Sequence, residues 1–205
     1  LADLRLATVS EVPTPWMCLQ HDLRLAGLDP DRVARIADRS MADNVAALET
    51  GAVDVVQVFE PFASLLESKG AGHVWYAAAR RGPTSYTTFY ARRATLHDRR
   101  DELLRMVRAI ARTEQWVARV GAVEVAGEIA PYFADVPRAI LERACARYKG
   151  LEIWGRSPVL PREGYERLHA SLVSGGFVAP GTPFETAVDN SLAERVVAER
   201  VSPLG

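Results

Sequence analysis

The sequence contains few of the residues from which metal and redox centres are built. Of its 205 residues only two are cysteines, Cys18 and Cys145, and their separation does not match the spacing of metal ligands. Each is predicted to be a small buried apolar side chain, with a disulfide between them as the alternative. No two histidines have the i, i+4 spacing of a helical metal site. The sequence therefore predicts no metal and no cofactor; the four histidines are His21, His73, His97 and His169.

The sequence also lacks an excess of charge of either sign and lacks long apolar runs. The 25 basic and 26 acidic side chains give a net charge of -1, so we expect no broad basic surface and no nucleic-acid partner. No stretch approaches the roughly 20 apolar residues of a membrane-spanning helix. The chain begins LADLRLATVS, without a signal peptide or an initiator methionine, and we expect it to be processed or truncated.

The common catalytic motifs are missing as well. Ser10 and Glu11 are not surrounded by the Gly-x-Ser-x-Gly pattern of a nucleophile elbow. The glycines of Gly70–Gly72 are too few and poorly placed for a phosphate-binding loop. We therefore predict no catalytic residue.

Short apolar runs alternate with amphipathic helical patterns through the first 60 residues. Such alternation implies an α/β fold with a mostly parallel sheet and right-handed crossovers. Two more strands are predicted further on, the second rich in aromatic and β-branched residues. The expected strands are Arg5–Val9, Val33–Ala37, Asp54–Phe59, His73–Ala77 and Tyr86–Ala91.

After Arg92 the pattern becomes almost entirely helical. A long amphipathic helix is predicted over Arg99–Arg119 and another over Ala122–Ala130. Three further helical segments are expected to open at Pro137, Pro161 and Pro183. These helices need a sheet to cover, and the first half of the chain is short of one.

The stretch DVVQVFEPF, residues 54–62, is an apolar run that stops at an acid and a proline. Ligands of open α/β sheets bind outside the carboxyl ends of the strands. Phe59 and Glu60 are therefore candidate ligand-binding residues. The alternative interpretation is that Phe59 belongs to the core and Glu60 caps the next helix.

The loop SEVPTPW, residues 10–16, joins the first strand to the first helix and carries hydroxyls, an acid and an indole. Thr14 is the expected N-cap. Free N–H groups at the start of this helix favour an anionic or strongly polar ligand group. Trp16 suits stacking on a flat ligand, and the alternative is that it packs inward.

Four stretches of the chain resemble one protein family. They are DLRLATVS, AGLDPDRV, MADNVAALETGAVDVVQVFEPF and TSYTTFYARR, and the most specific part is residues 47–62. Together they are similar to the substrate-binding proteins of bacterial ABC importers for nitrate, sulfonates, taurine and thiamine-pyrimidine precursors. The resemblance covers nearly the whole chain, more weakly after Arg119.

The resemblance implies a type-2 periplasmic binding fold, in which two α/β lobes close over a ligand. Residues 1–86 would form lobe two, and residues 87–205 the mostly helical C-terminal part of lobe one. A hinge is expected near Ala79–Tyr86, where Gly82 and Pro83 lie. This sequence departs from the family in two ways: the first sheet of lobe one is absent, and Arg5 runs straight into Leu6 without an intervening Gly-Lys or Gly-Arg.

The resemblance also implies a ligand site at the edge of lobe two. An acid-lined pocket with an aromatic side chain favours a cationic or amine-bearing flat ligand over a sulfonate. The expected ligand-binding residues are Ser10, Glu11, Thr14, Trp16, Phe59, Glu60, Thr87 and Thr88.

The implied function is that of a solute-binding component. It would capture a small organic molecule, such as a pyrimidine-like or other nitrogen-bearing ligand, outside the cytoplasm and deliver it to a membrane permease. Two alternatives stay open. One is an enzyme similar to the pyrimidine synthases of thiamine biosynthesis, which use a cysteine-rich iron-binding stretch; the other is the effector domain of a transcriptional regulator.

Overall fold

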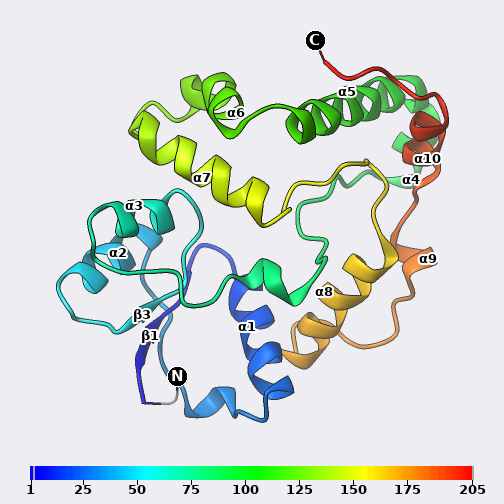
Figure 1. Cartoon of the computed structure of the whole chain (residues 1–205). Helices are drawn as coiled ribbons and strands as arrows, with labels where there is room; N and C mark the ends of the chain where they lie inside the picture. The colour runs from blue at the N-terminus through cyan, green and yellow to red at the C-terminus, as the bar shows by residue number, and fades with distance from the viewer. Residues whose placement is uncertain (2, 205) are drawn as a thin grey trace.

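A parallel three-stranded sheet lies within the first 60 residues of the computed structural model, which describes residues 1 and 3–204 (Figure 1). Strand β1 (Arg5–Ala7) is central, and it pairs with β2 (Ala34–Ile36) on one side and β3 (Val55–Val56) on the other. The predicted alternation and the parallel pairing are both confirmed. Ala2 and Gly205, which fall within the predicted ranges 1–86 and 87–205, lie outside the described residues.

Helices α1 (Thr14–Leu25), α2 (Met41–Glu49) and α3 (Phe62–Ser68) follow the three strands. Gly27 ends α1 at φ +74, a conformation that costs a glycine nothing, and Leu28 N–H then donates to a carbonyl of the last helical turn. The helical pattern of the first half is thus confirmed.

The start of α1 differs from the prediction. Thr14 is the first helical residue rather than the N-cap, and no side chain caps this helix. The reason is that Pro13, at φ -80 and ψ -25, already has helical backbone angles and accepts a hydrogen bond from Met17 N–H at 3.2 Å. The helix therefore begins one residue earlier than a threonine cap allows.

Strand β3 is much shorter than the predicted Asp54–Phe59. Gln57 N–H donates to Ala7 O at 2.8 Å, and β1 ends at that residue. Because β1 ends there, its pairing with β3 stops and the chain turns away after Gln57. Phe59 and Glu60 consequently lie in the turn that follows the strand.

The two later strands, His73–Ala77 and Tyr86–Ala91, were predicted wrongly. Among the described residues neither segment pairs with a strand, and a strand needs a neighbour to bond its backbone groups. Their aromatic side chains are left exposed, with Trp75 at 60% and Tyr90 at 90% of full accessibility. Between the two segments, η2 (Ala78–Arg81) is a short 3-10 turn.

The second half of the described chain is helical, as predicted. Helices α5, α6 and α7 lie together at the top of Figure 1, and α8 lies beside α1. The elements are α4 (Arg93–Asp98), α5 (Arg100–Arg119), α6 (Ala122–Ile129), α7 (Arg138–Gly150), α8 (Arg162–Ser174), α9 (Phe184–Ala187) and α10 (Ser191–Ala198), with 3-10 turns η1 (Pro30–Arg32) and η3 (Ala130–Tyr132).

Three apolar clusters form the core. The first contains Ala7 and Val53 beneath the sheet, the second joins α5 to α10 around Leu104, and the third joins α6 to α7 around Leu141. Cys145 belongs to the third cluster, and both cysteines are free, so the buried-thiol interpretation is confirmed for this residue.

Packing between helices attaches the helical half to the sheet half. Helix α8 packs against α1, and α7 packs against α3. The division at residue 86 stays a prediction.

We expect Leu104→Ala to lower the free energy of unfolding by about 2–4 kcal/mol, because it leaves a cavity between α5 and α10. Leu104 is 1% exposed. Urea denaturation measures the change. Leu25→Ala is the control, since this leucine is 75% exposed; equal losses for the two variants would contradict the assignment of the core.

Acid stability provides a second test. Arg5 donates to Asp54 from its guanidinium and its backbone N–H, and these bonds lower the pKa of Asp54 to about 2. A depressed carboxyl pKa stabilises the fold above its unfolded value of 3.8, and this contribution is lost as the pH falls toward 2. Asp54→Asn should therefore flatten the loss of stability over this range in urea titrations. The exposed Asp135→Asn is the control, and an unchanged profile in Asp54→Asn would refute the linkage.

Candidate functional site

The carboxyl ends of the three parallel strands bring polar side chains to one edge of the sheet. Thr8 follows β1, Arg35 lies in β2, and Gln57 follows β3. The loop after β1 leads directly into α1, so Trp16 joins the same edge. This arrangement is the one expected for a ligand site of an α/β sheet.

Arg35 and Trp16 form the centre of this edge. The guanidinium carbon of Arg35 lies 4.3 Å from the centroid of the Trp16 ring, which is a cation–π contact. Arg35 Nε also donates to Thr8 Oγ1 at 2.9 Å. Arg35 is exposed as a residue, but partial burial of its guanidinium lowers its pKa, and among the described residues no carboxylate pairs with it.

Sequence reasoning did not find Arg35. It lies in the run VARIA, where a single arginine in a short strand was taken as part of the strand pattern. The only signal available was a charged side chain at the centre of the predicted strand Val33–Ala37.

Two buried amides fix the loop around this site. Asn44, which is fully buried, donates from Nδ2 to Thr8 O at 3.1 Å, and Gln57 donates from Nε2 to Pro15 O at 2.9 Å. The carbonyl oxygens of both amides are buried and have no hydrogen-bond donor among the described residues. Loop 8–15 is therefore held by one side chain of α2 and by the side chain that follows β3.

Glu11 is near the site, but its carboxylate already has partners. Glu11 Oε1 accepts a hydrogen bond from Met41 N–H at 2.9 Å, at the start of α2, and Ser10 Oγ donates to Oε2 at 3.4 Å. The Met41 N–H is the main cause of the lowered pKa of Glu11. Glu11 therefore acts as a cap for α2 in this structure.

The carboxylate of Glu60 accepts even more hydrogen bonds than that of Glu11. Its side chain is 4% exposed and accepts from Arg147 Nε at 2.5 Å, from Ser64 N–H at 3.0 Å and from Ser64 Oγ at 3.0 Å. Arg147 also forms an ion pair with Glu67 on α3, through Nη2. The alternative interpretation, in which Glu60 caps the next helix, matches these contacts.

The other predicted residues surround the edge more loosely. Phe59 is half-buried in the turn after β3, and Thr14 is half-buried in the first turn of α1. Thr87 is exposed and Thr88 half-buried in the connection to α4. Among the described residues, neither of these hydroxyls bonds to the group around Trp16. Of the predicted residues, Trp16 is the one in contact with Arg35, while Ser10 and Glu11 are hydrogen-bonded to each other in the loop before α1.

A buried ion pair lies on the other side of α1. Arg81, whose side chain is 7% exposed, donates to Asp22 Oδ1 at 2.9 Å and to Ser171 Oγ at 2.7 Å. Tyr76 also donates to Asp22, and burial together with this bond raises the pKa of Tyr76 to about 12. The expected hinge near Gly82 is therefore attached to both α1 and α8; its movement stays a prediction.

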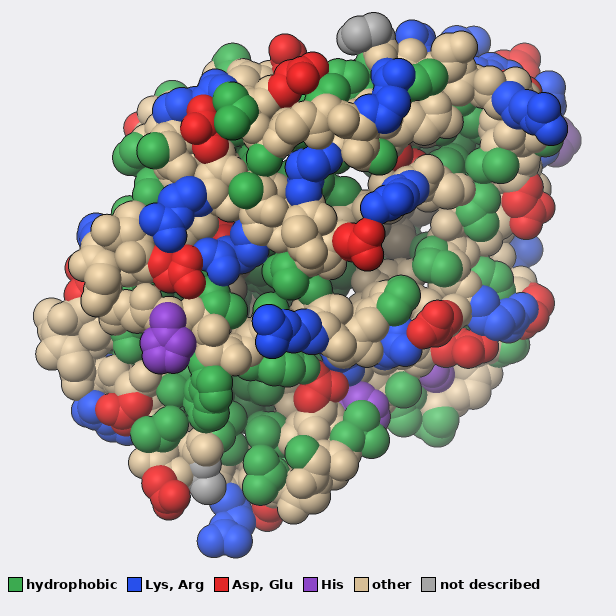
Figure 2. Space-filling view, viewed as in Figure 1, with side chains coloured by type: hydrophobic (Ala, Val, Ile, Leu, Met, Phe, Trp, Pro, Cys, Tyr) green, Lys and Arg blue, Asp and Glu red, His purple; other side chains and the backbone are tan. Residues whose placement is uncertain are grey.

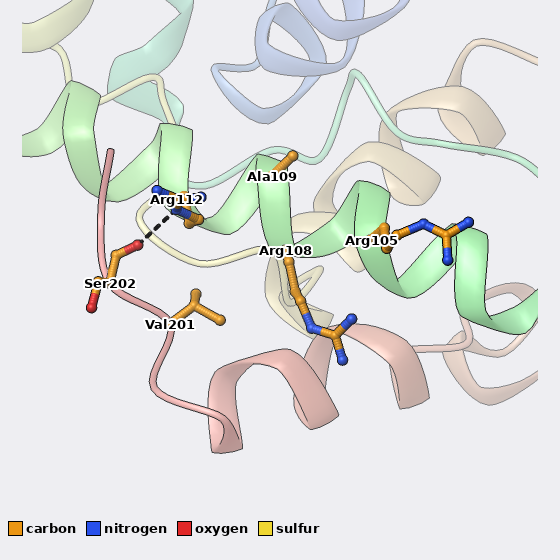
Figure 3. Close-up of a pocket in the computed structure, with 6 residues that line it drawn as sticks. All are labelled: Arg105, Arg108, Ala109, Arg112, Val201 and Ser202. Atoms are coloured by element: carbon orange, nitrogen blue, oxygen red, sulfur yellow. Dashed lines mark hydrogen bonds between the residues drawn. The ribbon is translucent and has the colours of Figure 1, made fainter. Parts of the chain in front are cut away.

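Two cavities lie away from the strand edge. One, of about 520 Å³, surrounds the Arg81–Asp22 pair between α1 and α8. The other, of about 410 Å³, lies between α5 and the C-terminal segment (Figure 3). There Arg108 pairs with Glu199 and Arg112 Nε donates to Ser202 O at 3.0 Å, so these arginines hold the C-terminal segment.

The surface and the remaining chemistry add little to this picture. On the face shown in Figure 2, Lys and Arg side chains are interspersed with Asp and Glu side chains. Within residues 1 and 3–204, no three His, Cys, Asp or Glu side chains are grouped to hold a metal ion. No helix of that part of the chain has the length and apolar character to cross a membrane.

The fold is shared with a solved ligand-binding protein. The structure resembles the crystal structure of the ligand-binding component of an ABC-type import system from Staphylococcus aureus, solved with zinc bound, with a TM-score of 0.71 and 17% sequence identity. The match covers 95% of this chain and 64% of that chain. It confirms the predicted fold class.

The sequence comparisons give the family. The profile of the NMT1-like family matches residues 2–131, and the chain belongs to this family. It is also 29% identical over 188 residues to a Bacillus subtilis (strain 168) protein named "Putative binding protein YtlA". The match covers 91% of this chain but 56% of that protein, so this chain spans about half the length of this relative. The predicted family is confirmed, and these relatives are binding proteins rather than enzymes.

We expect Glu60→Gln to lower the free energy of unfolding by about 1–3 kcal/mol, because it leaves Arg147 with one carboxylate instead of two in a poorly solvated place. Chemical denaturation measures the loss. The control is Glu152→Gln, which removes an ion pair whose two side chains are 73% exposed, and it should change stability by less than about 0.5 kcal/mol. A Glu60→Gln protein as stable as this control would show that the network is unimportant.

Proposed function

We propose that this chain belongs to the solute-binding component of an ABC-type importer. It binds a small organic molecule at the strand edge around Trp16 and delivers it to a membrane permease, outside the cytoplasm. The observation that carries the proposal is the convergence of Thr8, Arg35 and Gln57 with Trp16 at the carboxyl ends of three parallel strands. The importer-type fold and the family membership support it.

Residues 1–86 act in this proposal as one lobe and residues 87–205 as the helical part of the other. The aromatic segments around Trp75 and Phe89 support a two-lobed whole, because they are irregular, exposed and without a strand partner among the described residues. Ligand binding then shifts an equilibrium between open and closed forms, with the bend near Gly82.

Each predicted site residue has a role in the proposal. Trp16 supplies a stacking surface, Ser10 and Thr14 supply hydroxyls, and Phe59 closes the apolar side of the edge. Glu11 and Glu60 hold α2, α3 and α7 in place through the bonds that they accept. Thr87 and Thr88 approach the ligand only if the connection after Gly82 moves.

The ligand in this proposal is flat and carries nitrogen, as a pyrimidine does. Trp16 offers the ring surface for such a molecule. Gln57 Oε1 lies at the same edge and has no donor among the described residues, so a ring N–H of the ligand supplies the missing hydrogen bond. Nothing in the structure favours the enzyme or the regulator over this function.

The test is calorimetric binding of pyrimidines, flavins, sulfonates and nitrate to the complete gene product. Trp16→Ala should weaken binding of the solute that is found by about tenfold or more, since it removes the stacking surface. Trp75→Ala is the matched control, because this indole is 60% exposed and lies outside the strand edge.

Two results would contradict the proposal. One is that no solute of the panel binds. The other is that Trp75→Ala weakens binding as much as Trp16→Ala does.

A further inference from the structure

Charged side chains join α3 to α7, which lie next to each other (Figure 1). Arg147 Nε donates to Glu60 at 2.5 Å, and Arg147 Nη2 donates to Glu67 at 2.5 Å. Arg143 Nη2 donates to the same Glu67 carboxylate at 3.3 Å. The backbone N–H of Glu60 donates to Tyr148 Oη at 3.3 Å. Polar groups of α7 therefore meet two carboxylates, one in the turn before α3 and one on α3.

The apolar core does not continue across this contact. The cluster beneath the sheet consists of residues between positions 7 and 56, and the other two clusters consist of residues between positions 96 and 201. In the described chain no core cluster thus contains residues of both parts. Polar contacts of this kind are typical of domains that move relative to each other.

The connections between the two parts have no regular structure that would prevent such a movement. Residues 82–92 and 151–161 form neither helix nor strand. Helix α8 stays with the sheet half, because Arg81 ties it to α1 through Ser171 and Asp22. The part that can move away from α3 is therefore α7 with α5 and α6, which share one core cluster.

Arg147 is at the centre of the contact. The side chain of Arg147 is 24% exposed and that of Glu60 is 4% exposed, so water and salt screen this pair less than a surface pair. Helix α7 can leave α3 only when both ion pairs of Arg147 are broken. Glu60 follows Gln57 by three residues, so the contact begins next to the strand edge.

We infer that Arg147, Glu60 and Glu67 form a latch between the two lobes. The latch favours the joined form, in which α7 lies on α3, over a separated form. The inference rests on the proposed function, because the lobes and their equilibrium are those proposed above. Arg147 is a positioning residue, since it acts on the relative position of the lobes and not on the solute.

The experiment measures distances between nitroxide labels on the complete gene product by pulsed electron paramagnetic resonance, after Cys18→Ser and Cys145→Ala. One label pair, on Ala46→Cys of α2 and Glu128→Cys of α6, spans the latch. The other pair, on Ala46→Cys and Glu166→Cys of α8, lies on the sheet side of it. All three labelled positions are exposed.

Arg147→Met should raise the population of the separated form about tenfold or more, because both ion pairs of the latch are lost. The distances from α2 to α6 then gain a second, longer component, while the distances from α2 to α8 stay the same. Arg143→Met is the matched control. It removes an arginine whose side chain is 49% exposed, and it should change the population by less than about threefold.

A second variant covers the case in which Arg147→Met fails to fold because Glu60 is left buried without a cation. Glu60→Gln combined with Arg147→Met removes both charges and should show the same longer component. Far-UV circular dichroism checks that each labelled variant is folded.

Three results would overturn the inference. The first is that the distances from α2 to α6 stay unchanged in the folded variants that lack Arg147. The second is that Arg143→Met has the same effect as Arg147→Met, and the third is that the distances from α2 to α8 change as well.

The calorimetric panel keeps this inference apart from the proposed function. If a solute binds and the loss of Arg147 does not move α6, solute binding stands and the latch is wrong. If Arg147→Met separates α6 from α2 and no solute of the panel binds, the latch stands and the proposed function is wrong.

Discussion

The pairing of β1 with both of its neighbours is the interaction on which this structure depends. Three residues of β1 bond to β2 and β3, and the ladder ends at Thr8 on one side and Gln57 on the other. Because all three strands run in the same direction, their carboxyl ends meet at one edge. The core cluster under the sheet and the position of the first turn of α1, which carries Trp16, follow from this short ladder.

The charges at that edge behave differently from what their positions in the chain suggest. A sequence shows that Glu11 and Glu60 are acids near strand ends, but it does not show that Met41 N–H and Arg147 already bind them. The partners come from segments 30 and 87 residues away. Such long-range pairs decide whether a charge is free for a ligand.

Rules that depend only on nearby residues in the sequence correctly predicted the elements that nearby residues determine. Gly27 ended α1 as expected, and the second half was correctly predicted as helical because its apolar spacing is strong. The segments 73–77 and 86–91 were predicted wrongly, since β propensity cannot supply a neighbouring strand. Arg35 was missed because its importance comes from Trp16, which lies 19 positions earlier and meets it only across the sheet edge.

The buried Arg81 has a consequence for how occupancy of the site is transmitted. Its bonds to Asp22 and Ser171 join α1 to α8, two helices far apart in the sequence. Helix α1 begins at the strand edge, two residues before Trp16, so we expect a displacement at that end to be passed on to α8. The solvent-facing side of α8 is thereby a suitable place to attach a fluorescent reporter that does not touch the ligand.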